Sequence, residues 1–225
     1  MRHAHRQRST LRLLEPTELS RGLWRWTAPH PEWQHGAPNS PDDWPREVGC
    51  ALFQTSSWAL FIDPLLPSDA TAFWHWADER CRSRSVAVLT TVSYHVRSRA
   101  AVIERYGAAS YEPAGDSEHV FPGGVQTFAI TPLGEMIVWI ASQKTLVPGD
   151  ALIGAAGGGL RLCPESWLDL APERVTLAEV RRQLLPLLEL PIERVLVAHG
   201  EPVLENGHKA LKQALEDEVV IRRAG

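Results

Sequence analysis

The sequence predicts an α/β protein, and three observations support that prediction. Apolar runs of strand length alternate with amphipathic segments of helix length, which is typical of an α/β domain. Residues 85–91 (SVAVLTT) are apolar almost throughout, as expected for a strand covered on both faces. With 225 residues, 44% hydrophobic and 22% charged, the chain has the size and composition of one domain. We therefore expect a flexible tail over residues 1–19 and a single domain over residues 20–225.

The first predicted strands carry an unusual number of tryptophans. Trp24 and Trp26 are two positions apart, so they share one face of a strand and are expected to pack in the core. The alternative is that they form an aromatic wall of a ligand pocket.

Residues 28–49 are rich in Pro, Gly and Asn and predict a loop. Two apolar runs follow, 48–55 (VGCALFQT) and 58–66 (WALFIDPLL), which indicate a β-hairpin.

Two helices are predicted next, on either side of the buried strand. Ser68 and Asp69 are good N-capping residues, and the segment 70–82 can bury one apolar face as a helix. After the strand, residues 97–107 (RSRAAVIERYG) read as a helix that ends at Gly107.

The second half of the chain repeats the alternation of strands and helices. The glycine-rich segment 154–159 (GAAGGG) predicts a flexible loop rather than a phosphate-binding loop, because no Gly-Lys-Ser/Thr follows it. Thr176 and Glu179 have the spacing of a capping box at the start of a helix. A terminal helix is expected over residues 207–223. Strands are predicted at 124–131, 135–142, 145–150 and 194–200.

Charge and hydropathy argue against two classes of partner. The net charge is −4 without a long run of either sign beyond the basic start, so we expect no nucleic-acid partner. No apolar stretch reaches the roughly 18 residues of a membrane span, and no secretory signal is present, so a cytoplasmic protein without a membrane partner is expected. Cys50, Cys81 and Cys163 lack CxxC spacing and predict buried thiols rather than disulfides or a zinc site. The oligomeric state is left open.

Three short segments carry a resemblance to a known family. They are LFIDPLL (60–66), PGDALIG (148–154) and VLVAHGEP (195–202). Their order, spacing and placement at strand ends, with the order of elements, resemble the metallo-β-lactamase-fold hydrolase superfamily from about residue 20 to residue 215. The resemblance implies a four-layer αββα sandwich with metal ligands on loops along one edge.

The ligand positions depart from the pattern of that family, which has a His-x-His-x-Asp-His motif, then Gly-His, Gly-Asp and His-Gly. Alignment on this pattern leaves only Asp150, the bridging carboxylate, and His199 as the family has them. The resemblance therefore implies a degenerate site that has lost its dinuclear metal centre. Thr91 and Ser93 stand at the first two histidine positions, His95 at the aspartate, Val96 at the last histidine, and Leu133 and Gly134 at the later histidine.

These replacements leave several functions open. The interpretation we favour from sequence is a metal-free binding protein or pseudoenzyme, in which His95 turns away and Asp150 hydrogen-bonds His199 in a cleft for a small molecule. The alternative is a hydrolase with a single Zn or Fe ion held by His95, Asp150 and His199, a donor set that leaves positions for water. Two further hypotheses are a serine nucleophile, Ser93, activated by His95 on one strand face, and a structural partner for another chain.

Five more residues are candidates around the site. Asp63 is expected to cap its strand and hydrogen-bond toward the turn with the degenerate motif. His30, Glu32 and His35 lie in the loop HPEWQH, which either enters the cleft as ligands or acid/base groups or stays at the surface. Arg97 either holds an anionic substrate group or is a solvated residue on the first turn of a helix.

Overall fold

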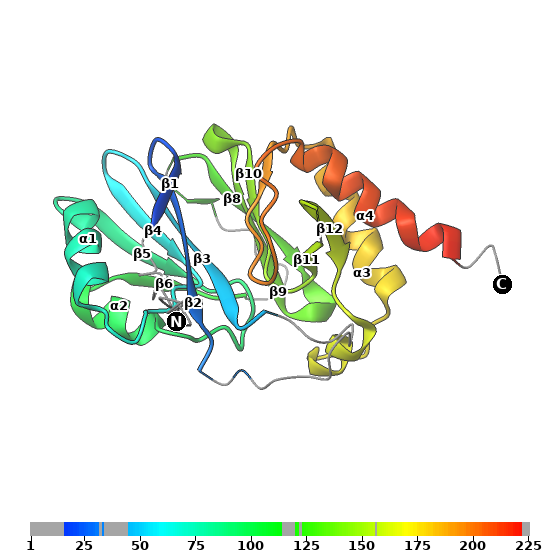
Figure 1. The fold of residues 1–225 in the computed structure, drawn as a ribbon, viewed down its shortest axis with the longest axis horizontal. Coiled ribbons are helices and arrows are strands. Elements are labelled where there is room, and N and C mark those ends of the chain that lie inside the picture. The colour runs from blue at the N-terminus through cyan, green and yellow to red at the C-terminus, as the bar shows by residue number, and fades with distance from the viewer. Residues whose placement is uncertain are drawn as a thin grey trace, which may run out of the picture.

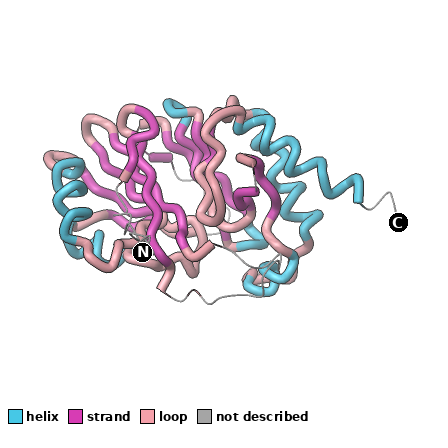
Figure 2. Tube along the Cα trace, viewed as in Figure 1, coloured by secondary structure: helices cyan, strands magenta, loops and turns pink. Residues whose placement is uncertain are grey.

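The protein is a sandwich of two sheets between two pairs of helices, as the predicted αββα architecture requires (Figure 1). The computed structural model describes residues 16–31, 33, 45–113, 120–121, 123–155 and 157–221. Figure 2 shows the strands in the middle and the helices on the two flanks. Helices α1 (Thr71–Cys81) and α2 (Arg99–Tyr106) flank the first sheet, and α3 (Leu177–Leu184) and α4 (Gly207–Ile221) flank the second.

The first sheet has six strands in sequence order. The predicted hairpin is confirmed as β3 and β4, which pair antiparallel, whereas β4, β5 and β6 pair in parallel. Strand β1 begins at Thr17, three residues before the expected start of the domain, and pairs with β2. The strands are β1 (Thr17–Ser20), β2 (Leu23–Pro29), β3 (Glu47–Gln54), β4 (Trp58–Ile62), β5 (Ser85–Leu89) and β6 (Ala109–Tyr111).

The second sheet has the strand order β13-β10-β9-β8-β7. The strand predicted over 194–200 is shorter than expected, because only Arg194–Val195 pairs in the sheet. Beyond it the chain leaves the ladder and reaches the first sheet, where Gly49 N–H donates to Ala198 O at 2.7 Å. The strands are β7 (Val120–Phe121), β8 (Val125–Ile130), β9 (Glu135–Ile140), β10 (Thr145–Val147) and β13 (Arg194–Val195).

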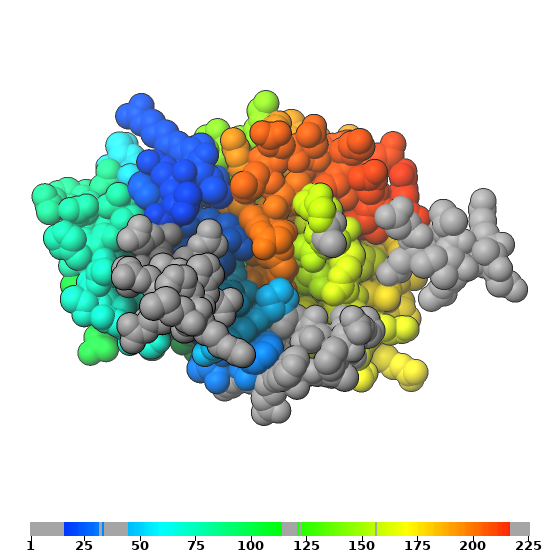
Figure 3. Space-filling view, viewed as in Figure 1, coloured from blue at the N-terminus to red at the C-terminus, as the bar shows by residue number. Residues whose placement is uncertain are grey.

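The glycine-rich segment 154–159 is not an open loop but the end of a hairpin. Strand β11 (Leu152–Ala155) pairs antiparallel with β12 (Gly159–Leu162), so the segment contributes residues to both strands. Gly154 N–H donates to His199 O at 2.8 Å. Figure 3 shows the segment after β13 (orange) between the first strands (blue) and this hairpin (yellow-green). The hairpin therefore supports the chain at His199 and just after it.

Three groups of buried side chains fill the three spaces between the four layers. Ile137 and Trp139 of β9 pack with α3 and α4, and Met136 and Val138 of the same strand pack against the first sheet. This alternation is the two-residue period of a strand covered on both faces. The third group joins the first sheet to α1 and α2 through side chains such as Phe73. The fold thus follows from the apolar pattern of its central strands.

The helix ends are partly as predicted. The capping box of Thr176 and Glu179 is present, and Gly107 ends α2 with a φ of 61°. Helix α1 begins after Ala70, and the predicted capping residue Asp69 accepts the N–H of Thr71, the first residue of the helix, at 3.1 Å. Short 3₁₀ helices connect other elements: η1 (Thr131–Leu133), η2 (Ala141–Gln143), η3 (Glu165–Leu170) and η4 (Leu185–Glu189). Within the described residues, no helix has both the length and the apolar character needed to cross a bilayer.

The tryptophans and cysteines lie where the core prediction places them. Trp26 is buried and contacts Phe73 and Trp76, while Trp24 packs edge-on against Trp76 at 5.6 Å between ring centroids. The tryptophans in the described ranges are buried or partly buried. An excess of exposed tryptophan, which would favour the hypothesis of a structural partner for another chain, is not seen there. The three cysteines are free and buried, as predicted: Cys50, Cys81 and Cys163.

Candidate metal centre

Loops from both sheets meet at one edge of the sandwich. His95 lies in the turn after β5, Asp150 in the loop after β10 and His199 in the segment after β13. Because β10 and β13 are parallel, Asp150 and His199 follow the same end of the second sheet. A hydrogen bond from Met136 N–H to Thr91 O at 2.7 Å ties the turn of His95 to this sheet. The structure thereby brings together three side chains that are far apart in sequence.

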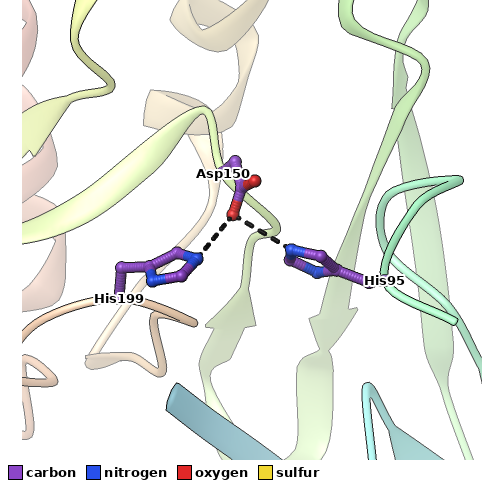
Figure 4. A group of neighbouring side chains, drawn as sticks. All are labelled: His95, Asp150 and His199. Carbon is purple, nitrogen blue, oxygen red and sulfur yellow. Dashed lines mark ion pairs between the residues drawn. The ribbon is translucent and has the colours of Figure 1, made fainter. Parts of the chain in front are cut away.

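His95, Asp150 and His199 form a compact buried group (Figure 4). Their ligand atoms lie within 4.8 Å of one another. The Nε2 atoms of His95 and His199 each lie 3.3 Å from the same oxygen, Oδ1 of Asp150. These side chains are no more than 12% exposed. Of the described residues, they are the group with the composition and spacing to hold a metal ion.

The two N···O separations of 3.3 Å are compatible with ion pairs and with ligation of a shared metal ion. A charge-assisted N–H···O bond is about 2.7–2.9 Å long, shorter than the observed separations. Zinc bonds of about 2.0–2.1 Å in a tetrahedron place neighbouring ligand atoms roughly 3.3–3.4 Å apart. Oδ1 of Asp150 is buried and accepts no well-formed hydrogen bond from the described part of the chain. The donor set therefore fits a single divalent ion with positions open to water.

Asp63 fixes the orientation of His95. Nδ1 of His95 lies 3.1 Å from Oδ2 of Asp63, and Asp63 also accepts hydrogen bonds from the backbone N–H of Thr91 (2.8 Å) and from its hydroxyl. The expected contact of Asp63 with this turn is thus present. An imidazole held through one nitrogen by a carboxylate presents its other nitrogen to a metal. The expectation that His95 turns away is therefore wrong.

The serine-nucleophile hypothesis also fails on geometry. Ser93 lies in a turn rather than on a strand, and its side chain is exposed. Both ring nitrogens of His95 face carboxylates, Asp63 on one side and Asp150 on the other. Ser93 and His95 therefore do not form the pair that the shared strand face implied.

Glu135 holds the loop of Asp150 and was missed by the sequence reasoning. Its buried carboxylate accepts backbone N–H bonds from Gly149 (2.9 Å), Asp150 (3.0 Å) and Ala151 (2.7 Å). A Cβ on Gly149 would lie 2.4 Å from Val92 Cγ2, so the loop is packed closely. The available signal was an acidic residue at the first position of an otherwise apolar strand.

The positions that depart from the family pattern add no ligand to the group. Thr91 is buried but bonds Asp63, and Val96 is 45% exposed. Gly134 has no side chain, and a Cβ there would contact Pro172. Ser93 points to solvent, as described above. In the described structure, the candidate ligands are therefore one histidine that follows the first sheet and an aspartate and a histidine that follow strands of the second.

Two aromatic residues that were not predicted pack against the ligands. The Tyr94 hydroxyl donates to Asp150 Oδ2 at 2.7 Å, and its ring contacts His95 edge-on at 5.3 Å between centroids. The Trp167 ring contacts His199 at 5.3 Å. The only sequence signal for Tyr94 was its position directly before His95.

Strong electrostatic coupling marks the group. Burial alone lowers the pKa of His95, but the carboxylates of Asp150 and Asp63 outweigh burial and raise this pKa to about 9. Burial alone raises the pKa of Asp150, yet His95 and His199 hold that pKa well below its usual range. Burial and the nearby Asp150 raise the pKa of Glu135 to about 7. Without metal, the site therefore favours a carboxylate at 150 and a protonated His95.

The stability of the metal-free protein should fall in alkaline solution. The pKa of His95 is raised from 6.5 to about 9, so its contribution is complete below pH 6.5 and is lost as the pH rises through 9. We expect the free energy of unfolding, measured with urea in the presence of a chelator, to decline between about pH 7 and 9. This decline should be much smaller in His95→Asn. An equal decline in both proteins would show that the loss of stability does not come from deprotonation of His95.

The remaining candidates lie elsewhere. His30 lines a cavity of about 350 Å³ with Trp33, Arg46, Leu65 and Leu66, and it is not in the metal-binding group. Glu32 and His35 fall outside the described residues.

Of the two predicted roles of Arg97, the solvated residue on the first turn of a helix is wrong, and the binding of an anionic group stays a prediction. It precedes α2, with a φ of 40°, and its half-buried guanidinium donates to the carbonyls of Gly49 (2.9 Å) and Asp63 (3.1 Å). Arg97 thus braces the backbone beside the site instead of facing solvent on a helix.

Comparison with known proteins identifies the architecture. No family model and no curated protein matches the chain. Among solved structures, the metallo-β-lactamase FIM-1 from Pseudomonas aeruginosa, in its mono-zinc form, matches with 11% identity and a TM-score of 0.61, covering 92% of this chain and 96% of that one. The metallo-β-lactamase from Pontibacter korlensis matches with 16% identity and a TM-score of 0.60, covering 91% and 99%. The DIM-1 metallo-β-lactamase exposed to ceftazidime matches with 13% identity and a TM-score of 0.61, covering 91% and 97%. This chain has the metallo-β-lactamase fold.

Proposed function

We propose that the protein is a hydrolase that uses one divalent metal ion, zinc or iron, held by His95, Asp150 and His199. The observation that carries this proposal is Oδ1 of Asp150, a buried carboxylate oxygen without a well-formed hydrogen bond, 3.3 Å from two imidazole nitrogens. In the metal-free protein these groups form ion pairs, and a divalent cation would take the place of the proton that His95 carries there. The resemblance of the site to half of a dinuclear centre agrees with a single ion.

The residues of the site divide the work between binding and support. His95, Asp150 and His199 supply the metal ligands, Asp63 keeps Nε2 of His95 directed at the site, and Glu135 holds the loop of Asp150. When bound, the ion supplies Lewis-acid polarisation of a carbonyl or phosphoryl oxygen and acidifies a water molecule. The buried position of the ligands keeps bulk water from weakening these interactions.

A small molecule is the substrate class that we propose. The depression that reaches Asp150 is small, and Tyr94, Leu133 and Trp167 are among the side chains that line it. A site of this size, with apolar walls and one polar centre, suits a small molecule.

Metal analysis tests the proposal directly. Protein purified without added metal, stripped with a chelator and reloaded with ZnCl₂ should bind one equivalent of zinc. Asp150→Ala and His199→Ala should weaken zinc binding by about 100-fold or more, beyond the roughly 10–100-fold effect of losing a supporting residue. His75→Ala is the matched control, because His75 is an exposed imidazole on α1 and should leave the stoichiometry unchanged.

Hydrolysis assays complete the test. The zinc-loaded parent should cleave activated esters or phosphodiesters, such as p-nitrophenyl acetate or bis(p-nitrophenyl) phosphate, faster than the stripped parent and faster than Asp150→Ala. A parent that takes up neither zinc nor iron would overturn the proposal in favour of a metal-free binding protein. Metal uptake without any hydrolysis would restrict the proposal to metal binding.

A further inference from the structure

The two oxygens of the Asp150 carboxylate have different surroundings. Oδ1 faces the imidazoles of His95 and His199 at 3.3 Å. Oδ2 accepts the hydroxyl proton of Tyr94 at 2.7 Å, the distance of a strong O–H···O bond. One oxygen is thus presented to the proposed ion and the other is held by a phenol.

Tyr94 is placed to control this carboxylate and one of the imidazoles together. It precedes His95 directly, and its ring packs edge-on against the ring of His95. The residue is 46% exposed, although its hydroxyl reaches the buried Asp150. A half-exposed tyrosine could bond its hydroxyl to water and keep its side chain free to move. The hydroxyl of Tyr94 instead points inward and bonds a buried carboxylate.

We propose that Tyr94 is a positioning residue that makes Asp150 a one-oxygen ligand of a single ion. This inference rests on the proposed metal-dependent function. A carboxylate can bind a metal through one oxygen or both. The hydrogen bond from Tyr94 holds Oδ2 away from the ion and thereby keeps the coordination number low, with positions open to water.

Glu135 does not set the rotation of the Asp150 side chain, because it bonds only backbone N–H groups of the loop. The ion pairs with the imidazoles hold Oδ1. The hydrogen bond from Tyr94 is the described contact that holds Oδ2.

The same hydrogen bond disfavours a second ion bound through Oδ2. A carboxylate that gives one oxygen to each of two ions needs both oxygens, and Oδ2 is already engaged by Tyr94. Tyr94 therefore limits Asp150 to ligation through Oδ1.

Cobalt(II) is the probe for this inference, because its visible absorption is strong when it has four ligands and weak when it has six. The variant Tyr94→Phe removes one atom from a half-exposed ring and leaves its packing in place. Tyr106→Phe is the matched control, because the Tyr106 hydroxyl also donates to an aspartate, Asp78, at 2.8 Å. That pair joins α2 to α1 and is not part of the candidate metal site. Both variants are compared with the parent by cobalt titration and by competition for zinc.

The parent and Tyr106→Phe should bind one equivalent of cobalt with the strong absorption of low coordination. Tyr94→Phe should show weaker absorption per bound ion and a zinc dissociation constant raised by about tenfold or more, the scale of losing a group that supports a ligand. Unfolding of the metal-free variants by urea should show that Tyr94→Phe is folded.

The outcomes separate the two proposals. If the parent binds metal and Tyr94→Phe matches it in absorption and affinity, the positioning role is overturned and the proposed function stands. If the parent binds neither cobalt nor zinc, the proposed function falls and this inference falls with it. If all three proteins bind one equivalent of cobalt and only Tyr94→Phe shows weaker absorption, the result supports both the proposed function and the positioning role of Tyr94.

Discussion

Replacing Glu135 by alanine is expected to destabilise the protein by about 3 kcal/mol or more. The substitution leaves the buried N–H groups of Gly149, Asp150 and Ala151 without their acceptor, and each unpaired group costs about 1–3 kcal/mol. The total stays below the simple sum because water can enter the space that the side chain leaves. Urea unfolding monitored by tryptophan fluorescence measures the effect. Zinc affinity should fall as well, because the loop carries Asp150.

Glu104→Ala provides the comparison for this variant. Glu104 is an exposed glutamate on α2, and a surface substitution of this kind normally changes stability by no more than about 0.5 kcal/mol. Glu135→Gln should lie between the two, since its amide oxygen accepts hydrogen bonds but its amide nitrogen cannot. Equal stabilities of Glu135→Ala and Glu104→Ala would show that the loop does not depend on this carboxylate.

Gly154→Ala should weaken zinc binding by about tenfold or more, although residue 154 contacts none of the ligand atoms. The added Cβ would lie 2.3 Å from Glu201 O and 2.9 Å from Gly200 C, closer than any real contact. The backbone that carries His199 must therefore move, and the 2.8 Å hydrogen bond from Gly154 N–H to His199 O is lost or strained. Isothermal titration with zinc measures the effect, since a displaced ligand costs affinity directly.

Gly157→Ala is the control from the same hairpin. Gly157 has a φ of 76°, and a Cβ there meets nothing within 4 Å. That variant should therefore lose about 1 kcal/mol of stability from backbone strain and keep its zinc affinity. Loss of zinc affinity in both variants would mean that the hairpin as a whole, and not its contact with His199, supports the site.

The architecture could be predicted because local patterns and burial agree in the central strands. The run 85–91 and the hairpin 48–66 are apolar on both faces, and each ends where a polar side chain is needed at the rim. The capping box at Thr176 and the glycine at 107 mark helix ends through interactions within a few residues. Such signals depend little on the rest of the chain.

Other features could not be predicted, because distant segments decide them. The segment 196–200 has the apolar character of a strand, but it crosses to the first sheet to meet Gly49 and so leaves the ladder. Residues 154–159 form a hairpin end because β12 pairs with β11 and because His199 lies against it. Arg97 donates hydrogen bonds to the carbonyls of Gly49 and Asp63, and no local sequence pattern predicts these contacts.

The candidate site shows the same division. The strand-end positions of His95, Asp150 and His199 could be compared with a family pattern, and the structure brings these residues together. Whether His95 faces the group depended on Asp63, which is 32 residues earlier in the chain. Glu135 and Tyr94 were missed because their contacts are with the loop of Asp150, which is distant in sequence. The sequence alone does not show that this loop lies beside them.

The two halves of the chain contribute unequally to the ligand set, and this has a consequence for assembly. The first sheet supplies His95, whereas Asp150 and His199 come from the second. Neither half could coordinate an ion fully when separated from the other. Ion binding is therefore thermodynamically linked to the docking of the halves, and it would stabilise the joined state by an amount that grows with free metal concentration. If the site binds metal as proposed, the free metal concentration would set part of the stability of the joined sheets.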